Sequence, residues 1–220
     1  MKQYDTIIFD MDGTLLDTLE DLQVSVNHAL AQKQLPQRTR EEIRSFVGNG
    51  VKRLVELASG FPEESPEFEA VFSIFKEHYG VHCDDHTRPY DGILELLSVL
   101  KEKGFRMAIV SNKYHEGVQE LKNRYFGEYL SVAIGEQEGI RKKPAPDTVM
   151  EALRQLGSSR ERSVYVGDSE VDIETAANSQ MDCVAVAWGF RIREEQERAG
   201  GRNFIQQPME LLDWLEQQEG

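Results

Sequence analysis

The chain has 220 residues, of which 40% are hydrophobic and 29% charged, a composition typical of a globular protein rather than a disordered one. Its 39 acidic residues outnumber 25 basic ones, and a formal net charge of −14 argues against nucleic acid and anionic membranes as partners. The first nine residues lack the pattern of a signal peptide, and no stretch approaches the roughly 18 apolar residues that span a bilayer. We therefore expect a cytoplasmic protein.

Short apolar segments alternate with longer amphipathic ones along most of the chain. The apolar segments predict strands at residues 4–9, 106–110, 132–134, 163–166 and 183–187. Between the later strands, residues 94–103 and 147–156 show helical spacing; Leu94, Leu97 and Leu100 are expected to share one buried face. This alternation predicts an α/β fold with a mostly parallel sheet and right-handed crossovers.

Residues 17–86 interrupt the alternation with several helical patterns and no convincing strand. Thr18 and Asp21 have the spacing of a capping box at the start of the first helix, and further helices are expected at residues 40–47, 51–58 and 66–79. The sequence thus predicts a helical cap domain of residues 17–86, inserted into a core of residues 1–16 and 87–220. An insertion after the first strand is expected at the carboxyl ends of the strands, where open α/β sheets bind ligands.

Two carboxylates follow the first predicted strand. Asp10 and Asp12 are two residues apart, so an extended chain projects them to the same side, and Gly13 then lets the chain turn away. Paired carboxylates suit a hard cation such as Mg²⁺, and a carboxylate can also attack phosphorus to form an aspartyl-phosphate. The alternative is an acidic turn with a purely conformational role.

A second acidic strand end follows residues 163–166. Asp168 and Asp172 lie four residues apart at the start of a predicted helix, as a shared metal site requires. For Asp172 a local role is equally compatible with the pattern, because Ser169 and Asp172 are spaced as a capping box.

Two further segments could bind phosphate. Ser111 and Asn112 follow a strand and offer a hydroxyl and an amide to phosphate oxygens, although the same pair is common in turns. Lys143 precedes a predicted helix and could offset the charge of a phosphoryl group, whereas its neighbour Lys142 is interpreted as a solvated loop lysine.

These four segments, in this order, resemble the four motifs of the haloacid dehalogenase superfamily of phosphohydrolases over nearly the whole chain. The resemblance implies a Rossmann-like, doubly wound core with a small helical cap, and Mg²⁺ as cofactor. Asp10 would be the nucleophile and a metal ligand, and Asp12 would be the general acid and base and offer its backbone carbonyl to the metal. Asp168 would be a further metal ligand, with Asp172 as a supporting carboxylate, while Ser111, Asn112 and Lys143 would bind the phosphoryl group.

Within the superfamily the chain is most similar to phosphoglycolate phosphatases. The residues that carry this similarity are less specific than the four motifs. The similarity is carried in part by a cap segment whose candidate substrate-binding residues are Arg44, Gly48, Asn49, Gly50 and Lys52. Glycine there lets backbone amides approach a substrate, and basic groups could meet a carboxylate or second phosphate. A helix-ending turn flanked by solvated basic residues is the competing interpretation.

The substrate class expected is a small phosphorylated metabolite. Pyrophosphate, a nucleotide and a sugar phosphate are alternatives to phosphoglycolate, and a phosphosugar mutase would share the aspartyl-phosphate. Outside enzymes, a phospho-accepting signalling module or a phosphate-binding protein combines similar residues. The acidic surface indicates a monomer or weak homodimer.

The segment from His82 to His86 contains two histidines, a cysteine and two aspartates, which could be taken for a transition-metal cluster. It falls where the cap rejoins the core, so we interpret it as a polar hinge.

Overall fold

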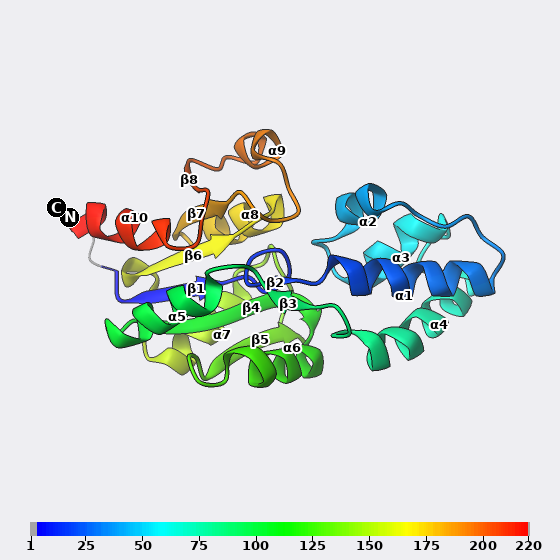
Figure 1. Cartoon of the computed structure of the whole chain (residues 1–220), viewed down its shortest axis with the longest axis horizontal. Helices are drawn as coiled ribbons and strands as arrows, with labels where there is room; N and C mark the ends of the chain where they lie inside the picture. Colours follow the sequence, from blue (N-terminus) through cyan, green and yellow to red (C-terminus); the bar gives the residue numbers. More distant parts are fainter. Residues whose placement is uncertain (1–3, 220) are drawn as a thin grey trace. The chain divides into compact units, whose positions relative to one another are not determined.

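The computed structural model describes residues 4–219, and the chain divides into two compact units (Figure 1). The core unit consists of the residues up to 15 and from 89 onward, and the inserted unit consists of residues 16–88. Within residues 4–219, no helix has both the length and the apolar character needed to cross a bilayer.

The core unit is built on a six-stranded sheet with the order β5-β4-β1-β6-β7-β8, whose paired strands run parallel. Figure 1 shows β1 between β4 and β6, and its residues Ile7, Ile8 and Phe9 are at most 1% exposed because neighbours cover both faces. The predicted fold class is confirmed. The strands are β1 Thr6–Phe9, β4 Arg106–Tyr114, β5 Val132–Glu136, β6 Ser163–Gly167, β7 Asp182–Val186 and β8 Asn203–Ile205.

Helices of the core unit pack their apolar stripes on this sheet. In α5 the buried face consists of Ile93, Leu96, Leu97 and Leu100, whereas Leu94 is 41% exposed, so the face predicted from Leu94 is wrong by one position. Strand β8 has three residues, too few for a periodic pattern, and was not predicted. The helices are α5 Ile93–Glu102, α6 His115–Leu121, α7 Asp147–Leu156, α8 Glu170–Asn178, α9 Arg193–Arg198 and α10 Glu210–Glu219, with a π segment Lys122–Phe126 and a 3₁₀ turn Arg160–Arg162.

The inserted unit is a small helical assembly. Its helices are α1 Leu19–Gln32, α2 Arg40–Phe46, α3 Val51–Ser59 and α4 Pro66–His82, and the short strands β2 Leu16–Asp17 and β3 Arg88–Pro89 pair where the chain enters and leaves it. Phe68, Phe72, Phe75 and Tyr79 stack along one buried face of α4. This stripe supplies much of the unit's apolar core.

The start of α1 differs from the capping box that the sequence predicts. Thr18 makes no side-chain capping bond, and its buried hydroxyl has no hydrogen-bond partner among residues 4–219. Asp21 instead accepts hydrogen bonds from the backbone amides of His86 and Thr87 and contacts His86 Nδ1 at 2.8 Å. Because this carboxylate is engaged 65 residues away in sequence, it is not available to cap the helix.

Replacing Asp21 with asparagine is expected to destabilise the inserted unit by about 2–4 kcal/mol, because the negative charge is lost and a donating NH₂ replaces one of the two accepting oxygens. Although burial favours the neutral acid, hydrogen bonds from Thr87 and His86 hold the pKa of Asp21 below its ordinary value. Its stabilisation is therefore present above the ordinary pKa and lost as pH falls through the lowered one. Urea unfolding of wild type and D21N from pH 7 to pH 3 measures this, and a difference that grows in acid would contradict it.

Candidate active site

Two acidic side chains meet at the carboxyl edge of the sheet. Asp10 directly follows β1 and Asp168 directly follows β6, and the two strands are paired with Phe9 opposite Val166. The backbone N–H of Asp10 extends this pairing by donating to the carbonyl of Val166 at 2.9 Å. The register of β1 and β6 therefore places both carboxylates at the same level along the two strands.

Asp10, Asp168 and Asp172 form a buried cluster whose carboxylate oxygens lie within 4.8 Å of one another. Within residues 4–219 this is the one group of three or more histidine, cysteine or acidic side chains that meets this distance. The Lys143 ammonium reaches into it, 2.8 Å from Asp10 Oδ1 and 2.7 Å from Asp172 Oδ1, and is 3% exposed. The arrangement places an ammonium against the carboxylate predicted to be the nucleophile.

The charges in this cluster do not balance, since three carboxylates face one ammonium. Burial and the neighbouring Asp172 raise the pKa of Asp10 well above its usual range, and the same two causes raise the pKa of Asp168 to about 7. For Lys143, burial opposes the charged form, but Asp10 and Asp172 outweigh it and raise the pKa above the ordinary value. A cation held by oxygen ligands would relieve the remaining negative charge, so the donor set fits a hard metal ion.

Asp172 is saturated by protein donors. Despite its burial, the Lys143 ammonium lowers the pKa of Asp172, so it is ionised. Its Oδ1 accepts hydrogen bonds from the Lys143 ammonium and from the Tyr165 hydroxyl, the latter at 3.0 Å. Its Oδ2 accepts hydrogen bonds from the backbone N–H groups of Asp168 and Ser169 and from the Ser169 hydroxyl. The predicted capping role is thus present. These contacts favour a supporting role over direct metal binding, which stays a prediction.

Ser111, Asn112 and Lys113 lie in the last part of strand β4. Ser111 Oγ is 3.4 Å from Asp12 Oδ2, and Lys113 Nζ is 3.6 Å from Asp12 Oδ1, which accepts no hydrogen bond among residues 4–219. The Asn112 amide donates to the carbonyl of Lys143 at 3.1 Å and accepts its N–H at 2.9 Å. Asn112 therefore holds the lysine segment in place, and its predicted contact with phosphate stays a prediction.

Asp168 is held from several sides. Its Oδ2 accepts the N–H of Phe190 at 2.6 Å, and its backbone carbonyl accepts Nε2 of Gln196 at 2.7 Å. Gln196 is fully buried and also donates to the carbonyl of Val186 at 2.9 Å, which ties together the ends of β6 and β7. Glycines leave room for this carboxylate, since a Cβ on Gly13 would lie 2.5 Å from Asp168 Oδ2.

Gly189→Ala is expected to lower kcat/KM about 100-fold, because its Cβ would lie 2.2 Å from Asp168 Cβ and displace the carboxylate. The control is Gly80→Ala, where the added methyl meets no atom within 4 Å. Steady-state kinetics of both variants, with circular dichroism to check folding, measures the effect. Equal kinetics for a folded Gly189→Ala would show that this close approach is unimportant.

The cap residues predicted to bind substrate lie in α2, in α3 and in the turn between them, all within the inserted unit. Arg44 lies in α2, and Gly48 and Gly50 have φ angles of 122° and 87°, which favour glycine. Asn49 is exposed, and the Lys52 ammonium pairs with Glu63 at 2.7 Å. Their contact with substrate stays a prediction.

Sequence reasoning missed three side chains of the site. Tyr165, Lys113 and Gln196 are each buried and bond to, or lie within ion-pair distance of, a predicted catalytic or metal residue. Tyr165 carries a hydroxyl between two valines of a fully buried strand, a signal that could have found it. Gln196 lies in a helix of charged residues 28 positions from Asp168 and gives no local signal.

The family described as haloacid dehalogenase-like hydrolase matches residues 7–186. An N-acetylmuramic acid 6-phosphate phosphatase of Pseudomonas aeruginosa is 33% identical, over 96% of this chain and 94% of that protein, and a phosphoglycolate phosphatase of Mesorhizobium japonicum is 32% identical over 87% and 86%. The crystal structure of a candidate phosphoglycolate phosphatase from Lactobacillus delbrueckii is 39% identical, with a TM-score of 0.90 over 98% of this chain and 99% of that chain.

The resemblance predicted from the four motifs is thereby confirmed. The family match spans most of the chain and contains all four motifs, and the similar proteins are phosphatases. The chain belongs to the haloacid dehalogenase-like hydrolases, as a phosphatase of that family.

Proposed function

We propose that the protein is a Mg²⁺-dependent phosphatase that hydrolyses a small phosphomonoester through an aspartyl-phosphate on Asp10. The observation that carries this proposal is the Lys143 ammonium, 2.8 Å from Asp10 Oδ1 within a buried group of three carboxylates. A phosphoryl group brings negative charge to this place, and a fixed ammonium stabilises that charge in a buried site.

Asp10, Asp168 and the backbone carbonyl of Asp12 would hold Mg²⁺, with Asp172 as the supporting carboxylate. The ion would neutralise charge on the phosphoryl oxygens and leave Asp10 able to approach phosphorus. The excess of buried carboxylate over ammonium supports this assignment, because Mg²⁺ prefers oxygen ligands.

Asp10 would form a bond from a carboxylate oxygen to phosphorus as the ester P–O bond breaks. Asp12 would give its proton to the leaving oxygen, which departs as the alcohol. In the second step Asp12 takes a proton from water, whose oxygen bonds to phosphorus while the Asp10–phosphorus bond breaks and inorganic phosphate forms. Ser111, 3.4 Å from Asp12, would donate a hydrogen bond to the phosphoryl group.

Phosphoglycolate is the first candidate substrate. The cap segment that contains Arg44 and the similarity of the chain to phosphoglycolate phosphatases both support it. N-acetylmuramic acid 6-phosphate is the second candidate, because the phosphatase described for that sugar phosphate matches 96% of this chain at 33% identity. Pyrophosphate is the third, since pyrophosphatases of Listeria are 32% identical over 84% of the chain.

The test is phosphate release from these three compounds, a nucleoside monophosphate and glucose 6-phosphate, with Mg²⁺ and with EDTA. We expect one strongly preferred substrate and loss of activity in EDTA that returns when Mg²⁺ is restored. Release that persists in EDTA would overturn the metal dependence. Transfer of phosphate within a sugar, with no release, would indicate a mutase, and no turnover by folded protein would favour a phosphate-binding module.

A further inference from the structure

We propose that the inserted unit carries a transition-metal site formed by His78 and His82 of α4, with His28 of α1 as a third ligand. The three residues lie within residues 16–88 and share no side chain with the acidic cluster of the core unit. The proposal does not rest on the proposed phosphatase activity, and it differs from the hinge interpretation of residues 82–86.

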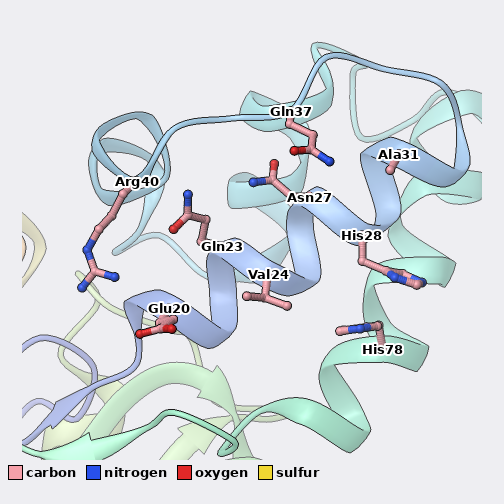
Figure 2. Close-up of a pocket in the computed structure, with 9 residues that line it drawn as sticks. All are labelled: Glu20, Gln23, Val24, Asn27, His28, Ala31, Gln37, Arg40 and His78. Carbon is pink, nitrogen blue, oxygen red and sulfur yellow. The ribbon is translucent and has the colours of Figure 1, made fainter.

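The first argument is spacing. His78 and His82 are four residues apart on α4, so they share one face of the helix, and their ring centres are 4.4 Å apart. Two histidines at this spacing on a helix are a known arrangement for binding zinc. His28 approaches from α1, and its ring centre is 4.1 Å from that of His78; Figure 2 shows the two rings facing each other from the two helices.

The second argument is the orientation of the rings. The Nδ1 of His78 is 3.0 Å from the Ser25 hydroxyl, and the Nδ1 of His82 is 2.7 Å from an Asp85 carboxylate oxygen. An oxygen partner on one ring nitrogen fixes the ring and makes the other nitrogen, Nε2, the one that can bind a metal. Carboxylate partners of this kind commonly accompany metal-bound histidines and increase their basicity.

The third argument is the surroundings of the rings. A hollow of about 260 Å³ is lined by His28, Ile74, Glu77, His78, Val81 and His82. His28 and His78 also line a second hollow of about 700 Å³ with Glu20 and Arg40 (Figure 2). The stacked imidazoles lie at the surface with half-exposed His82, so they contribute little apolar burial, and a glutamate beside them favours a cation.

The protonation state of the middle ring agrees with this. Burial and the two neighbouring imidazoles lower the pKa of His78 below its ordinary value, so the ring is neutral at pH 7. Neutral imidazole is the form that binds zinc, copper and nickel.

Binding requires a small movement of side chains. The rings of His28 and His78 are stacked, and the ring of His82 is tilted against that of His78. Their nitrogens are not all within 4.8 Å of one another, as the oxygens of the acidic cluster are. Around a tetrahedral zinc ion, two nitrogens lie about 3.4 Å apart. Since the ring centres are already 4.1 and 4.4 Å apart, rotation about side-chain bonds at the surface can bring the nitrogens together.

The test is calorimetric titration of the full chain with Zn²⁺ in excess Mg²⁺, which competes with Zn²⁺ for the oxygen ligands of the acidic cluster, together with the electron paramagnetic resonance spectrum of the Cu²⁺ complex. We expect one Zn²⁺ per chain and nitrogen hyperfine lines from imidazole. The double variant His78→Ala/His82→Ala should bind at least tenfold more weakly, and Asp85→Asn about tenfold more weakly through lost orientation of His82.

The control is His86→Ala, which removes a histidine of the same unit outside the stack and should bind as wild type does. Circular dichroism checks that α4 remains helical, which is expected since alanine favours helix. Absence of binding by wild type, equal binding by the double variant, or loss of binding in His86→Ala alone would overturn the proposal. His28→Ala should also weaken binding, and unchanged affinity would overturn the three-ligand site.

Discussion

Asp10→Asn is expected to lower kcat by at least about four orders of magnitude, because asparagine keeps the shape of the side chain but is not a competent nucleophile. Asp10 is 7% exposed, pairs with Lys143 and belongs to the buried cluster with Asp168 and Asp172. The same substitution removes an acidic group whose pKa is raised by burial and by the neighbouring Asp172. Metal-free D10N should therefore unfold at the same temperature as metal-free wild type or higher.

The sign follows from linkage. An acid whose pKa is higher in the folded state than in the unfolded state destabilises the fold once the pH exceeds the unfolded pKa. Replacing Asp10 with a neutral residue therefore does not lower stability at pH 7. The control is Asp91→Asn, an exposed aspartate of the core unit, for which neither activity nor stability should change. Single-turnover kinetics and thermal unfolding measure both effects, and near-wild-type turnover by D10N would refute the nucleophile assignment.

Lys143→Met is expected to reduce kcat/KM about 1000-fold and to cost about 3–5 kcal/mol in the free energy of unfolding. The ammonium is buried between Asp10 and Asp172, and its loss leaves their negative charges unpaired. Their folded pKa values would rise, so the stability deficit should be largest at neutral pH and shrink as pH falls toward the ordinary carboxyl range.

The matched control is Lys142→Met, because Lys142 precedes Lys143 and is exposed. Urea unfolding at pH 7 and pH 4.5, together with steady-state kinetics, separates the two contributions. A Lys143→Met protein with wild-type kinetics would remove the lysine from the proposed chemistry. A deficit that grows in acid would contradict the charge argument.

The sequence predicts the sheet because its central strands contain short apolar runs, residues 7–9 and 164–166, that are buried on both faces. Residues 4–9 and 163–166 needed no tertiary information to be recognised, and the register between them then brings Asp10 beside Asp168. Strand β8 was missed because three residues carry no periodicity. Leu94 was misplaced because i and i+3 spacing alone does not distinguish two neighbouring faces of a helix.

Local sequence patterns do not predict which side chains contact residues far away in the chain. Asp21 has the spacing of a capping residue, and its use by His86 and Thr87 depends on the return of the chain 65 residues later. The role of Gln196 likewise depends only on the backbone carbonyls of Asp168 and Val186, to which its side chain donates. For Asp172 the sequence left two roles open, and the structure shows the capping bonds together with the Lys143 contact.

The position of β1 has a consequence for how the protein is made. Thr6 pairs with Arg106 on one side and Ser163 on the other, separations of 100 and 157 residues. Closing such long loops has a high entropic cost and slows folding. During synthesis, the first strand must wait until most of the chain has left the ribosome, and Asp10 meets Asp172 only afterwards. The inserted unit, whose contacts lie within residues 16–88, is synthesised before Arg106 and Ser163 and can fold before the acidic cluster forms.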